Sequence, residues 1–135
     1  MPARSSPHGP SGLGDVFDNL KSVLSRYASG FSVHTGRVKN KRDYHLILEK
    51  PVVIDGRKKK ELWFASVIQQ KASVGFYFLP VYFCPEVKAK LVPELLKHLD
   101  GKGCFHFKSL DPGWEKQVDG ALKAGLGAYR KRKWL

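Results

Sequence analysis

Three segments rich in β-forming residues follow one another along the chain, and the connections between them are too short to hold a helix. The segments are Tyr44–Ile54, Glu61–Gln69 and Val74–Leu79. The first connection contains Asp55-Gly56, a dipeptide typical of tight hairpins. Parallel strands need a crossover of about a dozen residues or more. We therefore predict that the three segments are antiparallel neighbours in one sheet, with Pro51 marking a bulge or an edge position.

Both faces of the predicted sheet carry apolar residues. Strict alternation in the second segment sets Leu62, Phe64 and Ile68 on one face and Trp63, Ala65 and Val67 on the other. A sheet with one solvated face usually alternates apolar with polar residues. The sequence therefore predicts a sheet that is covered on both faces. Because two helices cover only one face, and large exposed apolar patches are rare on monomers, a homodimer is slightly favoured over a monomer.

A helix is predicted before the sheet segments, and shorter elements after them. An apolar stripe with helical spacing begins near Asp15, and Gly30 is expected to end this helix. The stripe consists of Val16, Phe17, Leu20, Val23, Leu24 and Tyr27. Residues 86–99 are predicted to form two short helices separated at Pro93. Cys104–Lys108 is predicted to be a short strand that pairs with the other strands, because a short strand is not stable alone.

The last predicted helix starts at Asp111-Pro112, with the aspartate as its N-cap and the proline in its first turn. This helix contains three glycines, each of which costs about 1 kcal/mol relative to alanine in a helix. The glycines are Gly120, Gly125 and Gly127. They point to a close approach between this helix and the sheet.

These elements predict an α+β domain, in which an antiparallel sheet of about four or five strands has the N-terminal and C-terminal helices packed on one face. Residues 1–12 are expected to form a flexible tail, and residues 13–135 a single domain. No apolar stretch approaches the ~20 residues that span a bilayer, and Met1–Gly14 contains no apolar signal core. We therefore expect a cytoplasmic protein with no membrane partner, in which Cys84 and Cys104 are reduced thiols.

The chain is strongly basic. Lysine and arginine number 24 against 12 aspartates and glutamates, which gives a formal net charge of +12. Such a field attracts polyanions, and three basic runs in turns or at the terminus are candidate phosphate contacts. Their basic residues are Arg37, Lys39, Lys41, Arg42, Arg57, Lys58, Lys59, Lys60, Arg130, Lys131, Arg132 and Lys133. A basic surface without a specific partner is favoured over nucleic-acid binding, which requires the runs to fold onto one side.

No segment of the sequence matches a catalytic or cofactor-binding motif. The stretch 101–103, Gly-Lys-Gly, lacks the spacing of a P-loop and opens a strand, so a turn is favoured over a phosphate site. His106 lies between two phenylalanines and is expected to face away from both. The other histidines have no acidic or cysteine partner at a recognisable spacing, and the cysteines lack the paired spacing of a zinc site. The sequence therefore predicts no catalytic residue, no cofactor and no metal site.

Three apolar and glycine-containing stretches match a known family pattern. They are Leu62–Ile68 with Val74–Tyr77, Leu95–Leu99 with Gly101–Phe107, and the Pro-initiated last helix. These stretches, within residues 62–129, resemble the DUF1801, or YdhG-like, family of small bacterial proteins of unknown function. The resemblance implies a fold grouped near frataxin, and some family members are labelled iron chaperones for that reason. Frataxins present an acidic ridge on the first helix, where this chain has only Asp15 and Asp18, so iron binding is the least favoured function.

Two main classes of function follow from the sequence. The favoured one is a non-enzymatic binding or assembly module, which uses a face of the sheet for self-association or for a small ligand. The alternative is an accessory protein that binds nucleic acid without sequence specificity, since no RNA-binding consensus or recognition helix is present. An enzyme ranks below both.

Overall fold

The structure of the protein is a computed structural model that describes residues 12–54, 56–101 and 103–135. The predicted tail up to residue 11, Asp55 of the predicted hairpin and Lys102 of the predicted turn lie outside the described residues. In chain order the elements are α1 (Gly12–Ser25), β1 (Ser32–His34), β2 (Asp43–Leu48), β3 (Val52–Ile54), β4 (Arg57–Lys59), β5 (Leu62–Gln69), β6 (Val74–Phe78), α2 (Leu79–Phe83), α3 (Pro85–Lys90), α4 (Pro93–Leu96), β7 (Leu99–Asp100), β8 (Cys104–Phe107) and α5 (Trp114–Lys131).

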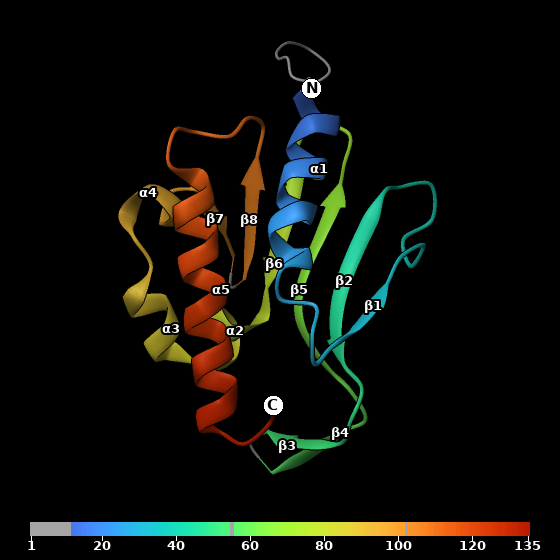
Figure 1. Ribbon diagram of the computed structural model, residues 1–135, viewed down its shortest axis with the longest axis vertical. Coiled ribbons are helices and arrows are strands. Elements are labelled where there is room, and N and C mark those ends of the chain that lie inside the picture. The colour runs from blue at the N-terminus through green and yellow to red at the C-terminus, as the bar shows by residue number, and fades with distance from the viewer. Residues whose placement is uncertain (1–11, 55, 102) are drawn as a thin grey trace.

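Six antiparallel strands form the main sheet in the order β1-β2-β5-β6-β8-β7, and β3 pairs with β4 in a small second sheet (Figure 1). The α+β class is therefore confirmed, as are the antiparallel pairing of β2, β5 and β6 and the pairing of β8 with β6. The first predicted segment is divided at Pro51, because β2 ends at Leu48 and β3 begins at Val52. The predicted hairpin thus joins the strands of the small sheet, while β2 pairs directly with β5.

The helices α1 and α5 lie side by side on one face of the main sheet, as predicted (Figure 1). Five members of the α1 stripe are buried, and they are Val16, Phe17, Leu20, Val23 and Leu24. The short helices α2, α3 and α4 pack beside α5, and Pro93 begins α4 as predicted. None of the helices in the described residues is long and apolar enough to cross a membrane.

Aromatic rings fill the space between the sheet and the two long helices. The ring of Phe64 stacks on Phe31 at a centroid distance of 4.7 Å. It also meets Phe78 at 5.6 Å and Tyr129 of α5 at 5.4 Å, both edge to face. The Tyr129 hydroxyl donates to the carbonyl oxygen of Trp63 at 3.1 Å. The centre of the core is therefore held both by ring packing and by a hydrogen bond from helix to strand.

A β-bulge in β5 decides which residues face the helices. Leu46 of β2 pairs with Ala65, but the next residue, Ile47, pairs with Trp63, so Phe64 is the extra residue. An extra residue shifts the alternation of a strand by one position. Phe64 and Ala65 therefore both belong to the core, although strict alternation placed them on opposite faces.

The predicted faces of the second β segment are therefore wrong from the bulge onward. Val67 joins Phe64 in the core, whereas Ser66 and Ile68 lie on the other face with Trp63. The second face thus mixes the apolar Trp63 and Ile68 with the polar Ser66. The argument for a homodimer assumed two apolar faces and so loses part of its premise, and the homodimer itself stays a prediction.

Two predicted helix ends are also wrong. Helix α1 ends at Ser25, and Gly30 lies in the following turns with a φ of 91°. Helix α5 begins at Trp114, after an N-cap glycine, Gly113, with a left-handed φ of 84°. Asp111 lies two residues before that glycine and does not cap the helix.

Gly125 of α5 is packed directly on the sheet and on α2. A Cβ atom at this position would lie 2.7 Å from Cζ of Phe78, 2.8 Å from Cγ of Pro80 and 3.0 Å from Cε1 of Phe64. The other two glycines predicted to allow a close approach have no such atom within 4 Å. The predicted reason for the glycines is therefore confirmed for Gly125 alone.

We expect Gly125→Ala to destabilise the fold by about 1–3 kcal/mol, because overpacking of the core outweighs a gain in helix propensity of about 1 kcal/mol. Gly127→Ala is the matched control, since its site is exposed and open. It should leave the free energy of unfolding unchanged or raise it by up to about 1 kcal/mol. Urea unfolding followed by circular dichroism measures both variants, and equal stabilities would contradict the packing argument.

Candidate functional site

On the face of the main sheet opposite α1 and α5, a row of six side chains runs across the sheet, with one member from each strand. Residues directly opposite each other on neighbouring strands point to the same face. From β1 across to β7, successive partners in the register are His34, His45, Ser66, Tyr77, Cys104 and Asp100. We call these six residues the polar row, and they are the candidate functional site.

The polar row is buried at its centre and accessible on either side. His45 and Ser66 are 1% and 2% exposed. Their neighbours in the row, His34, Tyr77 and Cys104, are partly exposed. The outer members are therefore available to a ligand, whereas the two central members belong to the scaffold that holds them.

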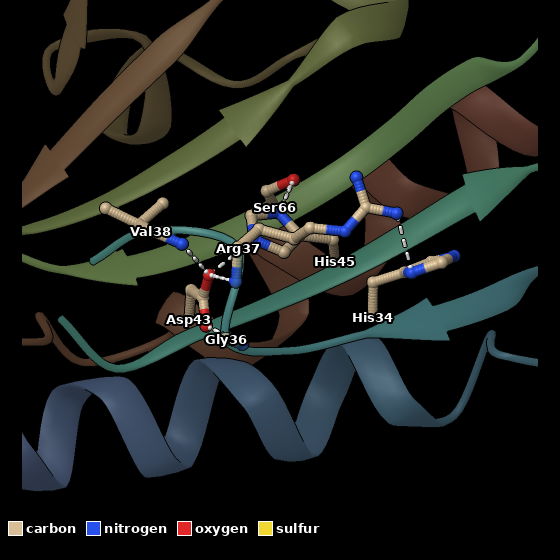
Figure 2. Close-up of polar contacts among 7 residues, drawn as sticks. All are labelled: His34, Gly36, Arg37, Val38, Asp43, His45 and Ser66. Atoms are coloured by element: carbon tan, nitrogen blue, oxygen red, sulfur yellow. Dashed lines mark hydrogen bonds and ion pairs between the residues drawn. The ribbon is translucent and has the colours of Figure 1, made fainter. Parts of the chain in front are cut away.

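The centre of the polar row is held by the buried carboxylate of Asp43, on the same face of β2. Backbone N–H groups of Gly36, Arg37 and Val38 donate to it at 2.6, 2.7 and 2.8 Å. Nε2 of His45 lies 3.0 Å from the same carboxylate (Figure 2). Burial raises the pKa of Asp43, but the hydrogen bonds from His45 and the three N–H groups outweigh it and hold the pKa below its usual value. The ionised carboxylate therefore ties the β1–β2 loop to the sheet.

Asp43, His45 and Ser66 form a hydrogen-bonded chain with the residue types of a hydrolase triad. Nδ1 of His45 lies 2.7 Å from Oγ of Ser66. An ionised carboxylate only accepts, so Nε2 of His45 donates to Asp43, and in a neutral imidazole Nδ1 then accepts from the Ser66 hydroxyl. A nucleophile must reach its substrate, yet Ser66 is only 2% exposed. We interpret the chain as a brace between β2 and β5.

Arg37 connects the outer strand β1 with the indole ring of Trp63. Its guanidinium donates to Nδ1 of His34 at 2.8 Å (Figure 2), which leaves Nε2 of His34 to donate to Glu49 at 2.5 Å. The guanidinium carbon lies 5.9 Å from the centroid of the Trp63 ring, within the range of a cation–π interaction. Trp63 in turn packs against His45, with ring centroids 5.0 Å apart. This end of the face offers a partly exposed indole beside a cation.

The other half of the polar row contains Tyr77 and Cys104. The Tyr77 ring lies over Gly75, where a Cβ atom would be 2.8 Å from Cε1 of the ring. Nε2 of Gln70 donates to the Tyr77 hydroxyl at 2.9 Å, and Sγ of Cys104 lies 3.4 Å from Nε2 of His106. Burial raises the pKa of the Cys104 thiol more than the hydrogen bond with Tyr77 lowers it. The thiol is therefore protonated at neutral pH and is not an activated nucleophile.

Two clefts open beside residues of this face. The larger has a volume of about 610 Å³ and is lined by His106, by the β5–β6 turn, by the segment 97–100 and by Lys108. The smaller has a volume of about 400 Å³ and is lined by Trp63 at the opposite end of β5. Its other basic and aromatic lining residues are Lys59, Lys60 and Phe83. Lysines outnumber carboxylates in both linings, where Glu61 is the acidic residue of the smaller cleft and Asp100 that of the larger. Both linings therefore carry a net positive charge, which favours anionic groups.

The structure brings two of the three predicted basic runs together. Lys59 and Lys60 line the cleft that contains Trp63, and Arg37 of the first run lies over the same indole ring. The remaining members that are exposed without such a contact are Lys39, Lys41, Arg57, Lys58, Arg130, Lys131 and Lys133. The meeting point of the two runs is therefore Trp63.

Two arginines of the predicted set are directed elsewhere. Arg42 pairs with Asp18 of α1 and lies over the ring of Phe17 at 4.4 Å, on the helix side of the sheet. Arg132 of the third run is paired with Glu86 of α3. The guanidinium groups of both arginines are therefore already paired with carboxylates.

Sequence reasoning missed the polar row, because its members come from six strands and only the pairing register aligns them. Within residues 12–54, 56–101 and 103–135, no three His, Cys, Asp or Glu side chains are grouped so that they could hold a metal ion. Comparison with protein-family models, with curated proteins and with solved structures found no match. The DUF1801 resemblance stays a prediction, and the functional argument depends on the geometry.

We expect Asp43→Asn to lower the free energy of unfolding by about 3 kcal/mol at pH 7, because a buried, charged acceptor of several hydrogen bonds is lost. The pKa of Asp43 is lower in the folded chain than the value of about 3.9 in an unfolded chain. Its ionisation therefore stabilises the fold above about pH 4, and this contribution is lost as the pH falls through the folded-state pKa. Urea unfolding at pH 7 and pH 3 should show the difference between wild type and variant shrinking in acid.

Asp100→Asn is the control for this prediction, because the Asp100 side chain is 82% exposed. It should change the free energy of unfolding by less than about 0.5 kcal/mol at either pH. A deficit of Asp43→Asn that stays constant from pH 7 to pH 3 would mean that the charge of Asp43 is not what stabilises the loop.

Proposed function

We propose that the protein is a non-enzymatic binding module whose anionic ligand lies along the polar row. The polar row is the observation that carries the proposal. Its members His34, Tyr77 and Cys104 are hydrogen-bonding side chains that are partly exposed. They stand on strands, which hold side chains more precisely than loops do. The buried Asp43–His45–Ser66 chain fixes the centre of the row, so the outer groups are presented in a defined arrangement.

We call the face of the main sheet opposite α1 and α5 the uncovered face, and the charges around it support an anionic ligand. Lys59 and Lys60 line the cleft at one end, and Lys97 and Lys108 line the cleft at the other. The net charge of +12 raises the local concentration of anions around the whole molecule. A ligand with one or more negative groups therefore meets attraction at long range and donors at short range.

The serine and the cysteine of the polar row support binding without covalent chemistry. Ser66 is buried under its neighbours, and the raised pKa of Cys104 keeps its thiol protonated. A nucleophilic catalyst must be accessible to its substrate and must also be activated. Neither Ser66 nor Cys104 meets both conditions.

Amide chemical shifts of the ¹⁵N-labelled full chain test this proposal, with phenyl phosphate, AMP and an octamer of thymidylate as separate probes. We expect shifts at Ser66, Tyr77 and Cys104, and none along the outer side of α3. Shifts confined to helix surfaces would contradict the proposal. Shifts that depend on protein concentration alone would indicate self-association on this face. Hydrolysis of p-nitrophenyl acetate or p-nitrophenyl phosphate that is lost in Ser66→Ala or Cys104→Ser would show an enzyme instead.

A second function, non-specific binding of single-stranded nucleic acid, is favoured by the meeting of two basic runs at Trp63. Bases stack on exposed aromatic rings without regard to sequence, and lysines and arginines neutralise the phosphates between them. Trp63 is partly exposed and has Lys59, Lys60 and Arg37 around it. This end of the face supplies the two kinds of contact that such binding needs.

If nucleic acid is the ligand, replacing Lys59 and Lys60 by Ser should weaken binding of a thymidylate octamer and reduce its salt dependence. Each phosphate contact contributes a slope of about −0.7 to the plot of log affinity against log salt for single strands. The double variant should therefore lower the slope by about 1.4, as measured by fluorescence anisotropy at several salt concentrations. The matched control replaces the exposed Lys88 and Lys90 of α3 by Ser. An equal loss of affinity in both double variants would mean that only the net charge of the protein matters.

A further inference from the structure

The cleft of about 610 Å³ beside His106 is large enough for a small ligand. It lies where three separate segments meet: the β5–β6 turn with Ala72 and Ser73, the segment from Lys97 to Asp100, and the end of β8 with His106 and Lys108. Ala72 is its small apolar lining residue. The cleft therefore combines hydrogen-bond donors with a small apolar surface, as ligand sites usually do.

His106 is held more loosely than the other histidines that the structure describes. Its Nδ1 lies 3.3 Å from Oγ of Ser73, and its Nε2 lies 3.4 Å from Sγ of Cys104 and 3.8 Å from the carboxylate of Asp100. The two contacts with oxygen atoms are longer than the usual nitrogen–oxygen distance of about 2.9–3.0 Å, whereas both contacts of His45 are 3.0 Å or shorter. The side chain of His106 is also 35% exposed. A ligand oxygen in the cleft can therefore replace weak contacts at this imidazole.

The charges that line the cleft leave one cation without a partner. The carboxylate of Asp111 is occupied by Lys97 and by Nε2 of His98, both at 3.1 Å, and these contacts hold its pKa below the usual value. Within the described part of the chain, Lys108 is exposed and has no carboxylate within 4 Å. Asp100 also lines the cleft, but solvent screens its charge because its side chain is 82% exposed. Lys108 is the charge available to a ligand.

We infer that this cleft binds the phosphate group of a small phosphorylated ligand, with Ser73, His106 and Lys108 as donors. The inference rests on the proposed function, since it names the group that one end of the uncovered face recognises. A phosphate has three terminal oxygens that accept charge-assisted hydrogen bonds. Three donors of different chemistry, from three positions around one cleft, match it better than they match the two oxygens of a carboxylate. The cleft volume of about 610 Å³ leaves room beyond the phosphate, beside Ala72, for an organic group.

The test uses the ¹⁵N-labelled full chain with phenyl phosphate, inorganic phosphate and benzoate as separate probes. Phenyl phosphate should shift the amides of Ser73, His106 and Lys108, and inorganic phosphate should shift the same amides with lower affinity. Benzoate should bind at least about tenfold more weakly than phenyl phosphate, because it offers fewer and less charged acceptors. If the true ligand is a free phosphate ion, inorganic phosphate should bind more tightly than phenyl phosphate. That result would overturn the inference that the ligand carries an organic group.

Variants with opposite expected effects on affinity distinguish specific binding in the cleft from attraction by the net charge of the protein. Lys108→Ser should weaken phenyl phosphate about tenfold, and Asp100→Asn should strengthen it about twofold. Ser73→Ala leaves the net charge unchanged and should weaken binding about fivefold. Lys88→Ser is the control, because Lys88 is exposed on α3 outside the cleft. Circular dichroism checks that each variant is folded.

Three results would overturn the inference. The first is an equal loss of affinity in Lys88→Ser and Lys108→Ser, and the second is equal affinity for benzoate and phenyl phosphate. The third is a set of shifts at Trp63 and Tyr77 without shifts in the cleft, in which case the proposed function stands and this site fails. If no probe shifts any amide of the uncovered face, both the inference and the proposed function fail.

Discussion

The single extra residue in β5 determines the character of both faces of the sheet. Because Phe64 is inserted between the partners of Leu46 and Ile47, residues on either side of it follow opposite alternations. Phe64 reaches Tyr129 and Phe78 in the core, while Ser66 is placed beside His45 on the opposite face. Without the bulge, either the aromatic core or the Ser66–His45 hydrogen bond would be lost. The same local irregularity therefore supports the packing of α5 and the centre of the polar row.

Burying a polar group costs free energy unless its hydrogen bonds are satisfied. The uncovered face meets this condition with a short chain of contacts, in which Ser66 donates to His45 and His45 donates to Asp43. The Asp43 carboxylate also takes three backbone N–H groups from the β1–β2 loop. The loop is held in this way, and its Arg37 side chain is positioned between His34 and Trp63. A buried network thus sets the geometry of exposed groups that are several residues away.

The sequence was sufficient to predict the class of fold, because β-rich segments joined by short turns favour antiparallel pairing. The connection between β2 and β5 is longer than predicted and contains the small sheet of β3 and β4. It also predicted the apolar stripe of α1 and the close approach at Gly125, which follow from helical periodicity and from the cost of glycine. It failed where a local irregularity overrides periodicity. The bulge at Phe64 has no composition signal, and Gly113 takes the N-cap position of α5 that Asp111-Pro112 was predicted to supply.

The candidate site was harder to predict than the fold, for a related reason. His45 and Ser66 are 21 residues apart in the chain, and Tyr77 and Cys104 are 27 apart. A shift of one residue in any pairing would send a member of the row to the other face. Basic runs, in contrast, are visible in the sequence, but Arg42 and Arg132 are paired with carboxylates on other elements. Charge could be counted from the sequence, whereas its placement could not.

Positive charge and the polar row act over different distances, and this difference separates the two candidate functions. The field of a +12 chain attracts any polyanion within a Debye length of about 8 Å at physiological salt, and it does not depend on the fold. Hydrogen bonds from Tyr77, His106 or Ser73 act only at contact and require the register of β5, β6 and β8. Non-specific binding of nucleic acid uses mainly the field, with Trp63 as a stacking surface. Recognition of a small ligand needs the ordered row, and the fold satisfies several buried polar groups to maintain that order. The internal hydrogen bonds of this face are therefore a stronger argument for a defined small ligand than the net charge is for a polyanion.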